Sequence, residues 1–182
     1  MHVCCGPCAV WPLTRLKEDN GISLSALFYN PNIHPHDEFE RRKAGAIEVA
    51  GLCKTPITVY NDCEQNRWEK FEETRNAEAP IAQVGGNRQV KPESRCQMCY
   101  SLRLGFAAKH AKEEGFDAFT TSLLISPYQD HEQIRELGKM YGSEFGVDFY
   151  YEDFRPRFRE GQRMAREMNI YRQSYCGCII SL

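Results

Sequence analysis

The residues best suited to chemistry in this sequence are its cysteines, which gather in three short clusters. The chain has nine cysteines among 182 residues. Seven of them fall in the segments "HVCCGPC", "SRCQMCY" and "YCGC". Because the number is odd and the sequence shows no secretory signal, we expect a cytoplasmic protein without a disulfide framework. Metal ligation or thiol redox chemistry is the better expectation.

The segment "SRCQMCY" predicts two thiols on one face of a helix start. Ser94 and Gln97 have the spacing of a capping box, and Cys96 and Cys99 follow on the first turns. The positive end of the helix dipole would lower the thiol pKa values and favour thiolates, which bind metals. The alternative is two small buried residues on an apolar helix face.

Cys4 and Cys5 offer a second pair of thiols. Adjacent side chains of an extended segment point to opposite sides, so both sulfurs reach one centre only where the backbone turns. Gly6-Pro7 supplies such a turn. Two pairs of thiolates suit either zinc or an iron–sulfur cluster, and the spacing does not separate these two.

The pair Cys176 and Cys178 differs in kind, because a single glycine separates the two thiols. A disulfide between them would close a small strained ring, and strained disulfides belong to the labile, catalytic class. The alternatives are further metal ligands or a disordered tail. The apolar side chains of Tyr171 and Tyr175 argue against disorder.

Other candidate metal ligands have simpler interpretations. Cys8 is either a fifth ligand or a core residue at the start of the first helix, and the core is favoured; Cys53 and Cys63, which have no thiol neighbour in sequence, are assigned to the core more firmly. His34 and His36 are expected to be exposed loop histidines.

Two further segments predict substrate contacts. "SPYQDH" offers Tyr128 and Gln129 for binding, and Asp130 as the N-cap of the next helix, with a carboxylate suited to donating or relaying a proton. Residues 155–172 carry six arginines against two glutamates, although the net charge of the chain is −2. A helix there, including Arg159 and Arg163, predicts a basic face for RNA, and a solvated face with ordinary ion pairs is the alternative.

The elements that must position these residues alternate between strands and helices. Expected strands span 22–30, 56–60, 117–124 and 147–154. Expected helices span 37–53, 66–75, 95–114 and 155–172, with another after "SPYQD" and a long loop at 76–93. This order predicts an α/β fold with a mostly parallel sheet flanked by helices, in a single domain over residues 1–182. Sites then form beyond the carboxyl ends of the strands, where "HVCCGPC" follows an almost absent first strand.

Five segments in order resemble the cobalamin-independent epoxyqueuosine reductases. They are "HVCCGPC", "FYNPNI", "RCQMCYSLRL", "TTSLLISPYQ" and "YRQSYCGC". The resemblance runs from residue 2 to near the C-terminus and implies a fold similar to the PP-loop or HUP type. It also implies the last step of queuosine synthesis, in which the epoxide of epoxyqueuosine at the tRNA wobble position is reduced to an alkene.

The same resemblance implies cofactors and partners. A 4Fe-4S cluster would be held by Cys4, Cys5, Cys96 and Cys99, with or without an additional iron. Cys176 and Cys178 would form the redox-active pair. The partners would be the anticodon arm of a tRNA carrying epoxyqueuosine and an electron donor such as a ferredoxin or a flavodoxin-like protein, with no membrane.

Two rival functions stay open at this point. A PP-loop-type tRNA sulfur-transfer enzyme would need a glycine-rich ATP-binding loop where "CCGPC" stands. A zinc-stabilised RNA-binding module would explain four cysteines but would leave the Cys176 and Cys178 pair without a function.

Overall fold

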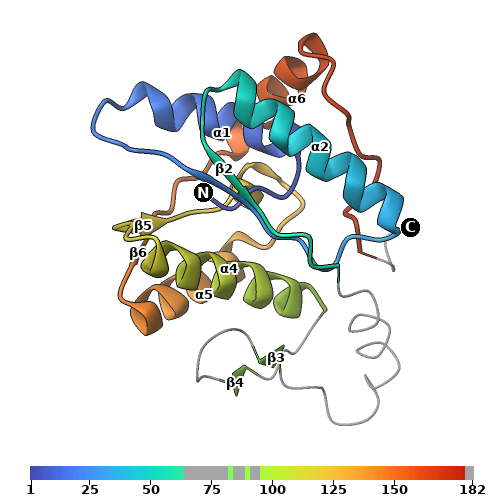
Figure 1. Ribbon diagram of the computed structural model, residues 1–182. Coiled ribbons are helices and arrows are strands. Elements are labelled where there is room, and N and C mark those ends of the chain that lie inside the picture. The colour runs from blue at the N-terminus through green and yellow to red at the C-terminus, as the bar shows by residue number, and fades with distance from the viewer. Residues whose placement is uncertain (64–81, 84–88, 91–94, 179–182) are drawn as a thin grey trace. The chain divides into compact units, whose positions relative to one another are not determined.

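The computed structural model describes residues 1–63, 82–83, 89–90 and 95–178 (Figure 1). Its internal contacts divide the chain into two compact units. Unit 1 comprises Met1–Cys63, Thr121–Gln129 and Glu152–Leu182. Unit 2 comprises Glu64–Thr120 and Asp130–Tyr151. No described helix is both long enough and apolar enough to cross a membrane.

Unit 1 is built on short parallel strand pairing. β1 (Ala26–Phe28) pairs in parallel with β2 (Ile57–Val59), and α2 (His36–Leu52) forms the crossover between them. The first strand is reduced to His2, which bridges Leu27 on one side and Thr121 on the other, both in the parallel sense. The prediction of parallel strands after an almost absent first strand is therefore confirmed.

Three helices of unit 1 pack together, with α1 in contact with both α2 and α6 (Figure 1). Their bounds are α1 Gly6–Glu18, α2 His36–Leu52 and α6 Phe158–Glu167, the last preceded by the 3-10 helix η2 (Arg155–Arg157). The apolar faces bury a core with β1, formed by Val3, Ala9, Val10, Leu13, Ala26, Phe28, Ile33, Phe39, Ala46, Val49, Ala165 and Ile170. The core thus fixes the first turn of α1, which follows the first cysteine pair.

Unit 2 places two helices beside a second short parallel pair. α4 (Arg95–Glu113) packs against α5 (His131–Phe145), and β5 (Ala118–Phe119) pairs in parallel with β6 (Asp148–Phe149). α5 ends at Gly146, which adopts the left-handed conformation (φ 68°) that glycine tolerates best. β3 (Ala82–Gln83) and β4 (Gln89–Val90) form an antiparallel pair.

The mixed architecture of helices and small parallel sheets agrees with the α/β prediction, and the PP-loop or HUP type stays a prediction. The helices expected at 37–53 and 95–114 are confirmed within a residue or two. The helix expected at 66–75 lies outside the described residues. The loop expected at 76–93 contains the two strands of the β3–β4 pair instead.

Four predicted elements proved too long, and the first of them, the strand expected at 22–30, covers only β1. The strand expected at 117–124 ends at Phe119, and the 3-10 helix η1 (Ser122–Ile125) follows, because the Thr121 side chain accepts a hydrogen bond from the Leu123 amide at 3.2 Å. The strand expected at 147–154 covers only β6. The helix expected at 155–172 ends at Glu167, since Asn169 has a positive φ of 56°.

Candidate thiol and redox site

Three cysteine sulfurs meet where α1 begins. Cys5 is the extended N-cap residue, and the helix starts at Gly6, so the chain turns between Cys5 and Cys8. The sulfurs of Cys4, Cys5 and Cys8 lie within 4.8 Å of one another, and all three residues are buried. The Cys4 and Cys5 sulfurs are 3.8 Å apart. We call these residues the thiol triad. Cys8 is buried as expected of a core residue, but it also joins the pair that the sequence singled out.

Two polar side chains hold the thiol triad from other parts of unit 1. The Ser122 hydroxyl donates to the Cys4 sulfur at 3.3 Å and accepts from the Cys4 amide at 3.0 Å. The Gln173 amide Nε2 donates to the Cys5 sulfur at 2.9 Å and lies 3.9 Å from the Cys8 sulfur. Neither residue was singled out from the sequence, although each lies inside a segment that carries the family resemblance.

The electrostatics of the thiol triad keep its thiols protonated unless a cation compensates them. The neighbouring Cys4 thiol, together with burial, raises the pKa of Cys5 to about 12. The Cys4 and Cys5 thiols and burial raise the pKa of Cys8 well above its ordinary value. Three adjacent sulfurs cannot all ionise without compensation, but a metal cation would supply it and displace the protons. The buried all-sulfur donor set therefore fits a thiophilic metal or an iron–sulfur cluster.

The other predicted pair of ligands lies in unit 2. Cys96 is exposed and Cys99 is buried, and both lie on the first turns of α4. The capping residue Ser94 lies outside the described residues. Because Cys4 and Cys5 belong to the other unit, a centre shared by all four thiols stays a prediction.

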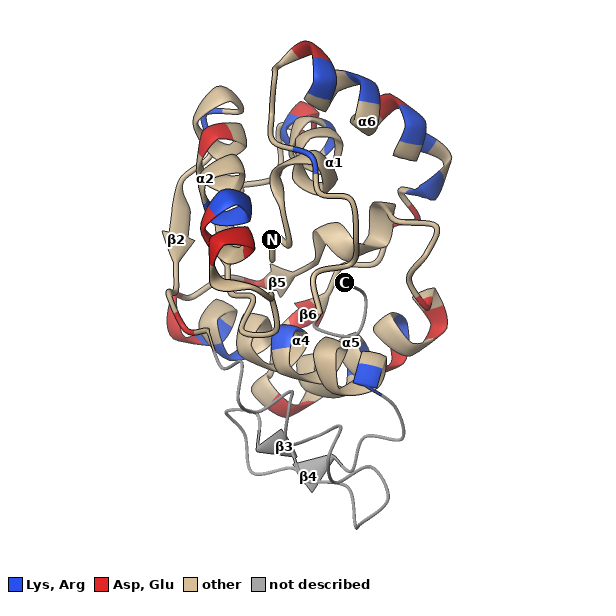
Figure 2. Ribbon diagram, turned by 90° about the vertical axis from the view of Figure 1, so that its right-hand side faces the viewer, with Lys and Arg blue, Asp and Glu red and all other residues tan. Residues whose placement is uncertain are grey.

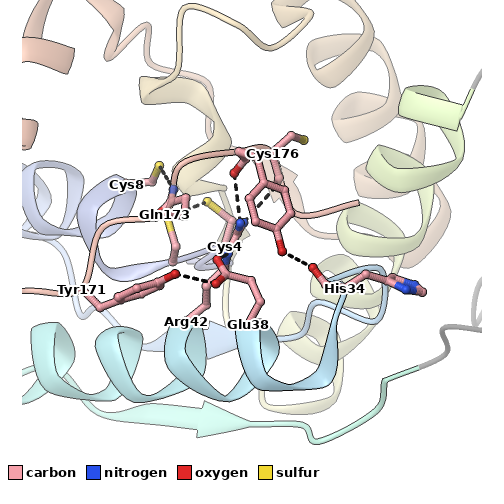
Figure 3. A network of polar contacts seen from close by, with 10 residues as sticks. Cys4, Cys8, His34, Glu38, Arg42, Tyr171, Gln173 and Cys176 are labelled. Atoms are coloured by element: carbon pink, nitrogen blue, oxygen red, sulfur yellow. Dashed lines mark hydrogen bonds and ion pairs between the residues drawn. The ribbon is translucent and has the colours of Figure 1, made fainter. Parts of the chain in front are cut away.

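The Cys-Gly-Cys segment lies against α2 in unit 1 (Figure 3). The Arg42 guanidinium donates to the backbone oxygens of Tyr175 and Cys176 at 3.0 Å and 2.9 Å. Cys176 is exposed, whereas Cys178 is buried. No disulfide joins any of the nine cysteines, each of which lies within the described part of the chain, so the pair has its dithiol form. The expectation that this tail is anchored rather than disordered is confirmed up to residue 178.

One histidine expectation is wrong. His34 is buried rather than exposed, because its amide donates to the Gly177 oxygen at 2.7 Å and its own oxygen accepts a hydrogen bond from the Tyr175 hydroxyl. His36 is exposed, as expected, and its ring lies 3.7 Å from the Glu40 carboxylate. The placement of Cys53 and Cys63 against the core is confirmed.

The residues of "SPYQD" lie at the end of η1 and the start of α5. Asp130 is the N-cap of α5, since its carboxylate accepts a hydrogen bond from the Gln133 amide at 3.1 Å. The Tyr128 side chain is 82% exposed and its ring lies edge-on to Phe158, with centroids 5.9 Å apart. The capping prediction is confirmed, and the substrate roles of Tyr128 and Gln129 and the proton role of Asp130 stay predictions.

The arginine-rich segment forms an exposed surface around α6, where basic and acidic residues alternate (Figure 2). Some arginines are paired: Arg163 contacts Glu167 at 3.2 Å, and Arg157 contacts Glu160 at 3.1 Å. Within the described chain, Arg159 has no acidic side chain within ion-pair distance. The surface therefore combines ordinary ion pairs with cationic groups that are available to a ligand.

Comparison with known proteins gives the same assignment over the whole chain. The model of the family described as "Epoxyqueuosine reductase QueH" matches residues 1–182. A protein of that name from Thermotoga maritima is 31% identical over 186 residues, covering 100% of this chain and 88% of the relative. One from Acinetobacter baylyi is 35% identical, covering 100% of this chain and 79% of the relative. The fold, the buried thiol triad and these relatives agree, and the chain belongs to the epoxyqueuosine reductase QueH family of oxidoreductases.

Proposed function

We propose that this protein reduces epoxyqueuosine in tRNA to queuosine. Family membership supports the activity. The observation that carries the chemistry is that one unit holds both a buried thiol triad and an anchored dithiol. Gln173 links them, because it donates to the Cys5 sulfur and lies three residues before Cys176. In this proposal, the metal-binding group and the two-electron reductant belong to the same unit.

The electron balance suits a dithiol. Conversion of the epoxide to an alkene requires two electrons and two protons, and the oxygen leaves as water. Oxidation of Cys176 and Cys178 to a disulfide releases two electrons and two protons, so one dithiol matches one epoxide. An external electron donor, such as a ferredoxin or flavodoxin-like protein, would then restore the dithiol. We place this cycle in the cytoplasm, where thiols are kept reduced.

The cofactor of this proposal is a 4Fe-4S cluster, with or without an additional iron, held by Cys4, Cys5, Cys96 and Cys99. When bound, such a cluster supplies single electrons. The hydrogen bonds from Ser122 and Gln173 would orient the sulfurs of unit 1 and tune the cluster potential.

The substrate would reach this site through phosphate and base contacts. Arg159 and Arg163 of the α6 surface would bind the backbone of the anticodon arm, and exposed Tyr128 would stack on a splayed base beside Gln129. Asp130 is exposed at the start of α5, where its carboxylate could relay a proton.

Two measurements on anaerobically purified protein test this function. Iron, acid-labile sulfide and zinc content report the cofactor, and nucleoside analysis of tRNA after incubation with a reductant reports the reaction. Cys96→Ala should lose iron and sulfide together. If Cys8→Ala loses the cluster while Cys96→Ala keeps it, the ligand assignment is wrong. Stoichiometric zinc without iron, together with unchanged epoxyqueuosine, would favour the zinc-stabilised RNA-binding module instead.

A further inference from the structure

We propose that the buried Glu38 and Arg42 pair of α2 is a positioning device that presents the Cys-Gly-Cys tail for reduction. This inference rests on the redox role proposed above for Cys176 and Cys178. The two side chains act on the backbone that carries the thiols, since Arg42 binds Glu38 and donates to the oxygens of Tyr175 and Cys176.

The ion pair of Glu38 and Arg42 is unusual because both of its charged side chains are buried. Arg42 Nε donates to Glu38 Oε1 at 2.7 Å, one turn away on α2, and the two side chains are only 3% and 4% exposed. Burying two charges is costly, and it is compensated only where the remaining donors and acceptors are satisfied. Here the tail satisfies them, so the pair and the tail depend on each other.

Arg42 supplies the donors for the tail backbone. Its Nη1 and Nη2 groups donate to the oxygens of Cys176 and Tyr175, and its guanidinium carbon lies 5.2 Å from the centre of the Tyr175 ring (Figure 3). The planar guanidinium can bind a carboxylate and two carbonyl oxygens at once. A lysine ammonium in the same place lacks this fixed fork geometry.

Glu38 binds the tail from the other side of the pair. Its Oε2 accepts a hydrogen bond from the Tyr171 hydroxyl at 2.5 Å. Side-chain contacts recur at Tyr171, Gln173 and Tyr175, whereas the side chains of Arg172, Ser174 and Cys176 are exposed. From Tyr171 to Cys176, side chains held by hydrogen bonds therefore alternate with exposed ones.

Gly177 is required at its position for two independent reasons. Its φ of 108° is a conformation that side chains rarely tolerate. A Cβ atom there would also lie 2.5 Å from Arg42 Nη1. The glycine thus lets the guanidinium approach the backbone between the two thiols. The result is an asymmetric dithiol, with Cys176 exposed and Cys178 only 6% exposed.

Alkylation of the two thiols tests the positioning device directly. We would compare the full-length parent with Arg42→Lys, which keeps the charge, and Gly177→Ala, which changes no charge. Ser174→Ala, an exposed change in the same tail, is the matched control. Mass spectrometry after timed treatment with iodoacetamide would measure the labelling rate of Cys178 relative to that of half-buried Cys53. Both variants should raise the relative labelling of Cys178 by at least roughly tenfold, the factor expected from losing one charge-assisted hydrogen bond.

The second readout separates positioning from general stability. In single-turnover reduction of epoxyqueuosine tRNA, both variants should lower the maximal rate by at least about tenfold while changing the tRNA concentration for half-maximal rate by less than about twofold. Iron content should match that of the parent. Parent-like labelling of Cys178 in Gly177→Ala and Arg42→Lys would overturn the proposal. Faster labelling of Cys178 combined with a parent-like maximal rate of epoxyqueuosine reduction would overturn it as well. If Arg42→Lys does not fold, Gly177→Ala decides. A parent without reductase activity would refute the proposed function, and with it the reductive role of the pair, even if labelling showed that the anchor exists.

Discussion

Replacement of Gly6 by alanine should destabilise unit 1 and disturb the thiol triad together. Gly6 is the first residue of α1, between Cys5 and Pro7. A Cβ atom there would lie 2.6 Å from the Ile170 side chain and 2.7 Å from the Gly45 backbone oxygen. Both separations are shorter than real Cβ contacts, and the backbone of α2 cannot rotate away as a flexible side chain can.

The expected cost follows from this overpacking. Insertion of a methyl group into a filled core typically costs about 1 to 3 kcal/mol, and because one of the two close contacts is backbone, we expect the upper half of that range. For a chain of this size, about 2 to 3 kcal/mol lowers Tm by roughly 4 to 12 °C. Because Cys5 directly precedes Gly6, a displacement of the first turn of α1 would also move the triad sulfurs. The iron content of the purified variant should therefore fall.

The matched control is Gly51→Ala in α2, where a new Cβ atom would meet nothing within 4 Å. Alanine has a higher helix propensity than glycine, so this variant should gain up to about 1 kcal/mol. Thermal unfolding of the metal-free, reduced proteins, followed by circular dichroism, measures the stability change of both variants. A Gly6→Ala variant as stable as the parent, with full iron content after reconstitution, would refute the packing of α1 on α2 described above.

Three further predictions concern the surface, the tail and the cluster. Charge reversal of Arg159 and Arg163 should weaken tRNA binding and lower the salt dependence, by roughly 0.7 to 0.9 per lost phosphate contact, as measured by filter binding at several salt concentrations; a parent-like slope would exclude this surface. The matched control reverses two exposed lysines of unit 2, Lys112 and Lys139. Burial, followed by the Glu38 hydrogen bond, raises the pKa of Tyr171 above its usual value. Because the folded protein favours the neutral phenol, Tyr171 contributes to the free energy of unfolding. This contribution is complete below about pH 10 and is lost as the pH rises through the raised pKa. Ultraviolet titration, with Tyr171→Phe to identify the signal, should therefore show a lower pKa in Glu38→Gln, and an unchanged pKa would contradict the contact. Cys96→Ser should purify without the visible absorption of a cluster, and a fully coloured variant would remove Cys96 from the ligands.

Local sequence signals predicted the parts of this molecule that depend on near neighbours. The helices α2 and α4, the cap at Asp130 and the pairing of Cys4 with Cys5 all arise from residues a few positions apart. The predicted turn at Gly6-Pro7 is confirmed, because α1 begins at Gly6 and proline is favoured in the first turn of a helix.

The parts that sequence reasoning missed depend on distant segments. The Arg42 contact with Cys176 spans 134 residues, and the Gln173 contact with Cys5 spans 168. A charged pair four residues apart on a helix ordinarily indicates a solvated face, so nothing local marked Glu38 and Arg42 as buried. His34 was misread for the same reason, because the tail that covers it lies far away in sequence.

The central claim is that the Cys176 and Cys178 dithiol delivers two electrons to epoxyqueuosine. Its most direct test is a single-turnover experiment without external reductant. Protein with a reconstituted cluster, reduced and then freed of reductant, would be mixed anaerobically with excess epoxyqueuosine tRNA, and the digested nucleosides would be quantified by mass spectrometry. We predict formation of queuosine up to one equivalent per chain, a matching loss of free Cys176 and Cys178 thiols, and none of either with Cys178→Ser. Equal queuosine formation by Cys178→Ser, with its cluster intact, would contradict the account.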